Sequence, residues 1–225
     1  MGDIVRRRKQ RKRGRIVLES ITYNMDCMEY MKSLPDKVFD LAVVDPQYGI
    51  SVSNNIGRRK GVKHSAYKKI EWDDSPPPPE YFEQLIRVSK NQIIFGANHF
   101  VELIPNANSP CWILWDKGFS EDVSFASFEM AWTSFKSPSK RVALSSAQKG
   151  RIHPTQKPVA LYAWIFSRYA NQGDKILDTH LGSGSSRIAA YDAGLDFVGC
   201  EIDPYYFDLE EQRFERHTAQ VRFDV

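Results

Sequence analysis

Leu41-Ala42-Val43-Val44-Asp45-Pro46-Gln47-Tyr48-Gly49 is the segment of the sequence that is most informative about the fold. Four consecutive apolar residues that end at a carboxylate and a proline are typical of a buried strand in a parallel sheet. Open α/β sheets bind their ligands at the carboxyl edge, where such a strand stops. The stretch therefore predicts an α/β fold with an acid, a carbonyl, an amide and an aromatic ring at one small site. A planar heterocycle with an amino group suits that set, and an ordinary strand-to-turn exit is the alternative.

A second strand-like run, from Lys175 to Asp178, leads into a glycine-containing loop. Gly182 and Gly184 allow the backbone to approach a ligand closely. Glu201 ends the next strand-like run, and an acid about 20 residues beyond such a loop is placed to bind ribose hydroxyls. A dinucleotide-binding fold offers the same parts, although Arg187 stands at its third glycine position. The segment indicates a nucleoside site, with a nicotinamide enzyme as the alternative for this segment alone.

Together the two segments resemble the DNA amino-methyltransferases, which methylate exocyclic amines with S-adenosylmethionine. Asp45-Pro46-Gln47-Tyr48 is similar to their Asp-Pro-Pro-Tyr catalytic motif, and Asp178 to Ser185 is similar to their cofactor loop. His153-Pro154-Thr155-Gln156-Lys157-Pro158 resembles the segment that precedes this loop when the catalytic motif comes first, an order known as the β class. Asn24 to Met28 resembles the segment whose acid reaches the cofactor adenine. The resemblance covers roughly residues 16 to 215.

The resemblance implies a Rossmann-like, doubly wound mixed sheet with a circularly permuted motif order. It implies catalytic roles for Asp45, Pro46 and Tyr48, with Gln47 and Asn98 near the target pocket. It also implies that Asp26 faces the adenine, Glu201 the ribose, and Thr155 with Lys157 the methionine carboxylate. The full set of implied cofactor-binding residues is Asp26, Cys27, Thr155, Lys157, Asp178, Leu181, Gly182, Gly184, Ser185 and Glu201.

Three departures from the family pattern stand out. Gln47 replaces the usual second proline of the catalytic motif, which makes that loop less stiff and adds an amide. Thr179 and His180 replace a proline and a phenylalanine of the cofactor loop, and Ser185 replaces a threonine but keeps the hydroxyl. The acid, the first proline, the tyrosine and both loop glycines remain, so we expect an active enzyme rather than an inactive relative.

Basic residues are concentrated near the amino terminus, between Arg6 and Arg15. The whole chain has a formal net charge of +3, so the remainder without this stretch is net acidic. Such an arm is suited to binding phosphates without reading sequence; a solubilising tail and a nuclear localisation signal are the alternatives. The candidate DNA-binding residues in this arm and in a second basic stretch are Arg6, Arg7, Arg8, Arg11, Arg13, Arg58, Arg59, Lys60 and Lys63.

We expect residues 1–15 to be a disordered basic arm and residues 16–225 a single methyltransferase domain. Residues 16–19 read as an edge strand, and a mobile basic loop is expected at about 51–74, over the active site. Apolar runs are too short to span a membrane and there is no signal-like segment, so a cytoplasmic protein is expected. The three cysteines are odd in number and widely spaced, and neither they nor the histidines show metal-ligand spacing.

The favoured function is methylation of the N6 amine of adenine in DNA, as in restriction–modification systems. A base inside a duplex cannot reach such a site, so it must flip out or be single-stranded. Methylation of cytosine N4 is the first alternative, but those relatives more often begin the catalytic motif with serine than with an acid such as Asp45. An RNA methyltransferase and a catalytically silent nucleic-acid-binding protein are the others. No separate recognition domain is visible, and a homodimer is expected because one domain has little surface for embracing a duplex.

Overall fold

Strand β3 (Phe39–Val44), which carries the opening stretch, lies near the middle of a nine-stranded sheet. The computed structural model describes residues 4–11, 17–50, 73–118 and 126–219. The strand order is β1-β2-β9-β8-β3-β4-β6-β5-β7, and only β1 and β6 run against the others. The other strands are β1 (Ile4–Arg11), β2 (Val17–Asn24), β4 (Ser89–Phe95), β5 (Trp112–Asp116), β6 (Phe128–Thr133), β7 (Lys140–Ala143), β8 (Lys175–Asp178) and β9 (Asp196–Cys200).

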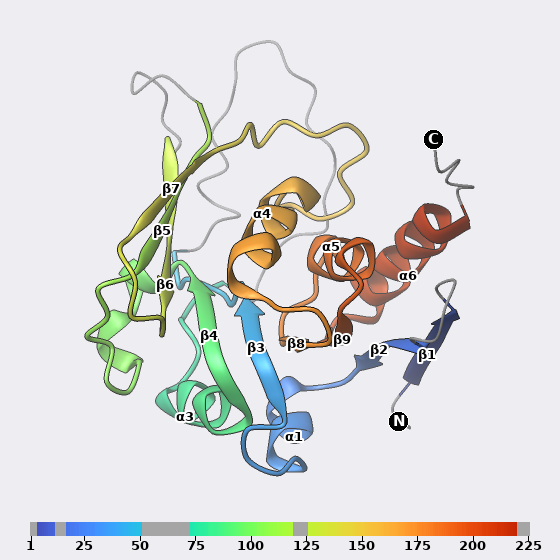
Figure 1. Cartoon of the computed structure of the whole chain (residues 1–225), viewed down its shortest axis with the longest axis horizontal. Coiled ribbons are helices and arrows are strands. Elements are labelled where there is room, and N and C mark those ends of the chain that lie inside the picture. Colours follow the sequence, from blue (N-terminus) through green and yellow to red (C-terminus); the bar gives the residue numbers. More distant parts are fainter. Residues whose placement is uncertain (1–3, 12–16, 51–72, 119–125, 220–225) are drawn as a thin grey trace.

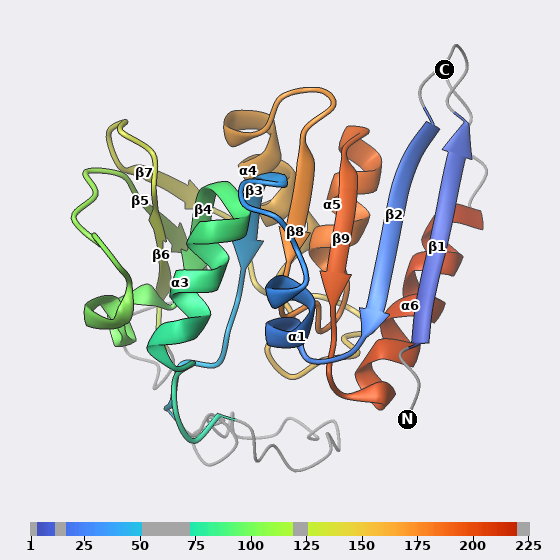
Figure 2. The same cartoon turned by 90° about the horizontal axis from the view of Figure 1, so that it is seen from below.

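Helices cover both faces of this sheet (Figures 1 and 2). One face carries α1 (Cys27–Lys32) and α3 (Pro79–Val88). The other carries α4 (Val159–Tyr169), α5 (Ser185–Ala193) and α6 (Pro204–Ala219). Short 3₁₀ helices, η1 (Ala97–His99) and η2 (Val101–Leu103), follow β4. Alternate residues of β3 enter the core on opposite faces of the sheet, which explains why its apolar run is unbroken.

The sheet reverses its winding direction between β3 and β8. From β3 the chain continues to β4 on one side, and from β8 it continues to β9 on the other. Leu41 pairs with Ile176 and Ala42 with Leu177 in a parallel register, so the carboxyl ends of β3 and β8 lie side by side. Ligands of open α/β sheets bind at such a switch point. The predicted α/β fold is confirmed, and the predicted catalytic and cofactor loops leave the sheet next to each other.

The amino-terminal segment differs from the sequence-based expectation. Ile4–Arg11 was predicted to be disordered, but it forms β1, which pairs antiparallel with β2 along its whole length. β2 was predicted to be an edge strand; it lies instead between β1 and β9. Arginine and lysine are common on edge strands because they discourage pairing with other chains, so a basic sequence is compatible with β1. The predicted mobile loop falls almost entirely within 51–72, outside the described residues.

The described part of the chain contains no helix long and apolar enough to cross a membrane. Within the same residues, no group of three or more histidine, cysteine or acidic side chains is arranged to hold a metal ion. All three cysteines are free thiols; Cys111 and Cys200 are buried and Cys27 is half-buried at the start of α1.

A fully buried arginine joins α5 to α6. Arg187 Nη1 contacts Glu210 Oε1 at 2.7 Å and Glu211 Oε1 at 2.5 Å, and all three side chains are buried. Thr22 donates a further hydrogen bond to Glu211 Oε1 at 2.6 Å. The guanidinium lies 3.8 Å from the ring centroid of Phe214. This cluster supports the predicted cofactor loop, because α5 begins directly after Gly184.

Replacing Arg187 with methionine should lower the free energy of unfolding by about 3–5 kcal/mol, because two carboxylates would then be buried without a cation. Thermal or urea unfolding of the variant measures this loss, and Arg216→Met on the exposed side of α6 is the control. Adding Glu210→Gln and Glu211→Gln to Arg187→Met should recover part of the stability. If the triple variant is no more stable than Arg187→Met, the arginine acts by packing on Phe214 rather than by charge.

Candidate active site

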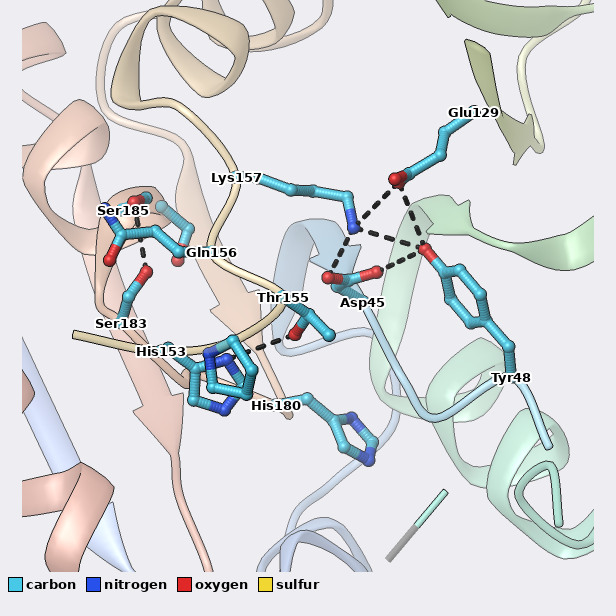
Figure 3. Close-up of polar contacts among 12 residues, drawn as sticks. Asp45, Tyr48, Glu129, His153, Thr155, Gln156, Lys157, His180, Ser183 and Ser185 are labelled. Carbon is cyan, nitrogen blue, oxygen red and sulfur yellow. Dashed lines mark hydrogen bonds and ion pairs between the residues drawn. The ribbon is translucent and has the colours of Figure 1, made fainter. Parts of the chain in front are cut away.

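Four side chains from three parts of the chain meet at the carboxyl end of β3 (Figure 3). Asp45 Oδ1 accepts a hydrogen bond from the Tyr48 hydroxyl at 2.6 Å, and Asp45 Oδ2 contacts the ammonium of Lys157 at 2.5 Å. The same ammonium lies 3.1 Å from Glu129 Oε2 and donates to the Tyr48 hydroxyl at 3.2 Å. Glu129 comes from β6 and Lys157 from the segment just before α4. The result is a compact charged cluster around the predicted catalytic acid.

The Tyr48 ring is held from several sides. Its backbone N–H and that of Gly49 donate to Asp73 Oδ1 at 2.8 and 2.9 Å, which fixes the turn after β3. Gly96 adopts a φ of +70°, and a Cβ built there would lie 2.1 Å from the tyrosine ring, so only glycine allows this approach. The exposed ring of His99 stacks on Tyr48 at 5.4 Å between centroids and 19° between planes. The ring is therefore set in place beside the carboxylate.

Burial and neighbouring charges give the three ionisable groups different behaviour. Burial raises the pKa of Asp45 above its ordinary value; Lys157 opposes this and Glu129 adds to it. Burial also disfavours ionised Glu129, yet Lys157 and Lys117 bring its pKa down to about 2. Burial works against charged Lys157 as well, but the two carboxylates raise its pKa above the ordinary value. At neutral pH Lys157 and Glu129 are charged. Of the three groups, Asp45 is the one whose pKa is shifted toward the neutral range.

The loop after β8 forms a backbone cradle beside this cluster. Gly182 and Gly184 have φ values of +51° and +69°, and Gly184 precedes the first turn of α5. The Gly182 N–H donates to Glu201 Oε2 at 2.8 Å, and Leu181 N–H donates to Cys200 O at 2.9 Å. The nearest atoms to a Cβ built at Gly182 would be those of the His153 ring, at 3.6 Å, an ordinary van der Waals distance. These are features of a loop that receives a ligand.

Three of the predicted cofactor residues, Asp178, Ser185 and Glu201, hold the backbone and side chains of this loop in place. Asp178 is buried and structural: Ser186 Oγ donates to Oδ2 at 2.5 Å and the His180 N–H to Oδ1 at 3.0 Å, while burial raises the pKa of Asp178 to about 6. Ser185 is also buried, and Arg213 donates to its hydroxyl at 2.9 Å. Glu201 uses both oxygens to hold the Gly182 and Asp203 N–H groups, and burial raises its pKa to about 7.

Two further predicted residues, Asp26 and Thr155, make local contacts. Asp26 is exposed and caps α1 by accepting from the Met28 N–H at 2.8 Å. Thr155 Oγ1 is 3.1 Å from His153 Nδ1, and burial lowers the pKa of His153 to about 4, so its imidazole is neutral. Ile202, directly after Glu201, is 69% exposed, a large apolar side chain beside the predicted ribose site. Acceptors, open backbone and an apolar face together fit a nucleoside.

The Lys157 side chain contacts the acid cluster, and its role at a cofactor stays a prediction. It was expected to reach the methionine carboxylate of a cofactor, but its ammonium is engaged by Asp45, Glu129 and Tyr48, with only 4% of the side chain exposed. Asn98 is exposed beside His99, and Gln47 is half-buried beside Tyr48. Of the predicted DNA-binding residues, Arg6 pairs with Asp208 at 2.8 Å. Arg7, Arg8 and Arg11 belong to β1, whereas Arg13, Arg58, Arg59, Lys60 and Lys63 lie outside the described residues.

Sequence reasoning missed three residues that shape the site. Glu129 was the easiest of the three to find from the sequence, because a lone acid in the aromatic run of β6 is unusual for a strand. His99 directly follows Asn98, which was predicted to lie near the target pocket, but nothing in the sequence indicates that its ring meets Tyr48. Asp73 lies 25 residues beyond Tyr48, so its hydrogen bonds to the turn are visible only in three dimensions.

Known DNA methyltransferases are similar to this chain in sequence and in fold. The family described as DNA methylase matches residues 109–212. The Type II methyltransferase M2.MboI of Moraxella bovis is 22% identical over 245 residues, which cover 89% of this chain and 89% of that protein. The M1.HpyAVI–SAM complex has a TM-score of 0.54 at 20% identity, over 85% of this chain and 98% of that one. The cytosine-N4-specific PvuII DNA methyltransferase has a TM-score of 0.60 at 12% identity, over 88% of this chain and 89% of that one.

The matched region runs from just before β5 into α6, so it contains Glu129, Lys157, the glycine loop and Glu201. The Asp45 motif lies upstream of it, on the neighbouring central strand. The relatives and the fold extend over most of the chain, including that strand. Residues 109–212 are therefore similar to the DNA methylase family, and most of the chain shares the fold of solved DNA methyltransferases.

Proposed function

We propose that this protein methylates the exocyclic N6 amine of adenine in DNA, using S-adenosylmethionine. The observation that carries the proposal is the adjacency of the Asp45 cluster and the glycine cradle at the switch point of the sheet. One loop offers acceptors for an amine beside an aromatic ring, and the other offers a nucleoside site within reach. This is the arrangement that a transfer between a cofactor and a flipped base requires.

The chain's own groups would align the amine rather than activate it chemically. An amino group on a purine is a weak nucleophile because its lone pair is delocalised into the ring. If Asp45 accepts one of its hydrogens and the Pro46 carbonyl accepts the other, the nitrogen can pyramidalise and direct its lone pair outward. Both Asp45 oxygens keep a free lone pair for this purpose, since each accepts one bond from Tyr48 or Lys157. Such alignment is worth about 7–11 kcal/mol in well-oriented reactions.

The cofactor supplies a methyl group on a positively charged sulfur. When bound, it would supply that methyl group to the aligned nitrogen, and the electron pair of the carbon–sulfur bond would remain on sulfur. The methylated amine then loses one proton, and Asp45 is placed to accept it because burial has raised its pKa. Glu201 and Asp26 would hold the ribose and adenine of the cofactor, with Ile202 packing against the purine. Gly182 and Gly184 would leave room for the methionine part.

The preference for adenine over cytosine rests on Asp45. N4 methylation of cytosine is chemically the same reaction, and the fold is shared with a cytosine-N4-specific enzyme. Relatives that act on cytosine more often have serine at the first position of the catalytic motif, whereas this chain has the acid. Tyr48, with His99 stacked on it, would provide the aromatic surface for the flipped base.

The substrate class is tested by incubating the protein with methyl-labelled S-adenosylmethionine and equal amounts of unmethylated DNA, RNA or free nucleosides. Label should enter DNA, and calorimetry should show cofactor binding without nucleic acid. Label found in RNA alone would identify RNA, instead of DNA, as the substrate. The absence of both cofactor binding and transfer would favour a silent nucleic-acid-binding protein.

Cofactor affinity should fall as the pH drops below about 7, because Glu201 has a raised pKa of about 7 and only its ionised form accepts fully from ribose hydroxyls. Above that pH the carboxylate is ionised and affinity is highest; below it, the loss can reach about tenfold per pH unit. Calorimetric titration between pH 6 and pH 8.5 measures the slope. Glu201→Gln should bind weakly with no slope in this range, and an unchanged slope would remove Glu201 from the site.

The basic arm should bind phosphates without reading sequence. Replacing Arg7, Arg8 and Arg11 with glutamine preserves the backbone pairing of β1, which a deletion would remove. DNA affinity should fall, and the slope of log affinity against log salt should flatten by roughly 0.9 for each phosphate that the arm no longer neutralises. The methylated sequence should not change. An unaltered slope would make the arm a solubilising segment.

A two-fold homodimer is part of the proposal, because no separate recognition domain is visible in the sequence. One subunit's loops would then help to hold DNA for the other. Sedimentation at micromolar concentration should give a mass near twice 25.9 kDa. Full activity from a monomer would rule this assembly out.

A further inference from the structure

Lys157 is a buried cation in contact with Asp45, and nothing about binding a base requires it there. Its ammonium lies 2.5 Å from Asp45 Oδ2, 3.1 Å from Glu129 Oε2 and 3.2 Å from the Tyr48 hydroxyl. It also lies 4.7 Å from the centroid of the Phe95 ring. Burying an ammonium costs free energy unless the group is paired, so Lys157 depends on these two carboxylates for its buried position.

Four charged side chains of alternating sign contact one another in succession, and the last of them is Asp45. Lys117, just beyond β5, contacts Glu129 Oε1 at 2.6 Å, and Glu129 contacts Lys157, which contacts Asp45. Exposed fractions of these side chains are 13%, 22%, 4% and 15%, so solvent screens the inner contacts little. Glu129 reaches Asp45 only through Lys157 and the Tyr48 hydroxyl, which lies 3.5 Å from Glu129 Oε2.

We propose that Lys157 and Glu129 are positioning residues that act through Asp45, with Lys157 keeping the carboxylate ionised and aimed and Glu129 holding Lys157 in place. This inference rests on the proposed function and extends it. An ionised Asp45 accepts an amine hydrogen, whereas a protonated carboxyl offers one acceptor fewer and a competing donor. The charge on Lys157 therefore sets the lowest pH at which the site can hold its substrate.

The other groups that face Asp45 do not replace this cation. Tyr48, Tyr81 and Tyr162 are neutral, because burial raises the pKa of each well above 10. Asp178 and Glu129 are acids, which disfavour a second negative charge nearby. Within the described residues, Lys157 is the cation in contact with the Asp45 carboxylate.

The two positioning residues should therefore shift the acid limb of the activity profile in opposite directions. Lys157→Met removes the cation and leaves Glu129, so Asp45 should need a higher pH to ionise. Glu129→Gln removes a like charge and leaves Lys157, so Asp45 should ionise at a lower pH. Opposite charges within contact distance shift a carboxyl pKa by about one to three units, which sets the expected size for Lys157→Met. The Glu129→Gln shift should be smaller, at about one unit or less.

Single-turnover methyl transfer to DNA, measured with saturating cofactor across pH 5 to 9.5, tests the proposal. The acid limb should move upward for Lys157→Met, downward for Glu129→Gln, and stay near the wild-type position for Lys157→Arg. Lys175→Met is the matched control, because that lysine also places its ammonium over an aromatic ring, 5.1 Å from the centroid of Phe39, but is remote from Asp45. Cofactor affinity should remain within a few fold in every variant.

Unmoved limbs with an active wild-type protein would overturn the inference and leave the proposed function intact. So would a large loss of cofactor affinity in Lys157→Met with an unmoved limb, which would assign Lys157 to the cofactor carboxylate. If Lys157→Met is inactive at every pH, Glu129→Gln decides: a downward shift supports the inference, and no shift or an upward one overturns it. A wild-type protein that transfers no methyl group would overturn both.

Discussion

Asp45→Ala should reduce methyl transfer by about a thousandfold or more, because the residue would hold the amine in line with the methyl group and such alignment carries much of the rate. Cofactor affinity should stay within a few fold, since the carboxylate contacts Tyr48 and Lys157 rather than the glycine cradle. Lys157 would not be left unpaired, because Glu129 still contacts its ammonium. Single-turnover transfer and calorimetric cofactor titration measure the two effects separately.

The matched control for this variant is Asp40→Ala on the same strand. Asp40 lies near the opposite end of β3, where it pairs with Lys90 at 2.7 Å on the surface. Its removal should leave transfer close to the wild-type rate. Activity of Asp45→Ala within about tenfold of wild type would show that the amine is not held by this carboxylate, since even one well-placed polar contact is usually worth more.

Gly96→Ala should lower the rate of transfer by about a hundredfold while leaving cofactor affinity unchanged. The new Cβ would lie 2.1 to 2.4 Å from three atoms of the Tyr48 ring, so the ring must move. Its hydroxyl would then leave Asp45, and the stacking surface formed with His99 would be disrupted. Transfer rates and cofactor titrations, with circular dichroism to check folding, measure the outcome.

Gly118→Ala separates this clash from backbone strain. Gly118 has a φ of +69°, nearly equal to the +70° of Gly96, but a Cβ there meets no atom within 4 Å. Both substitutions carry the same left-handed penalty of about 1 kcal/mol, so only the contact with Tyr48 differs. If the two variants have similar activity, the position of Tyr48 does not matter for transfer.

The sequence predicted the central sheet well because its signals are local. The apolar run of β3 and the run Lys175 to Asp178 each identify a buried strand, and the residues that follow them were placed correctly at one edge. These features depend on neighbours in the chain, which a single sequence displays directly.

What the sequence did not predict depends on pairing over long distances. The basic composition of Ile4–Arg11 suggested disorder, whereas backbone pairing with β2 makes it a strand. The contact between Lys157 and Asp45 was not expected either, because it depends on Glu129, which lies 28 positions earlier on β6 and offers a second carboxylate. No periodicity or composition carries that information, since the two acids are brought together only by the order of the strands.

The identity of the methylated nucleoside tests the proposed reaction most directly. Unmethylated DNA is incubated with the protein and methyl-labelled S-adenosylmethionine, digested completely to nucleosides, and separated by chromatography with mass detection. An amine held by Asp45 and the Pro46 carbonyl predicts label in N6-methyladenine. Label in N4-methylcytosine would contradict the assignment of the base, and the absence of label from every nucleoside would contradict the assignment of the reaction.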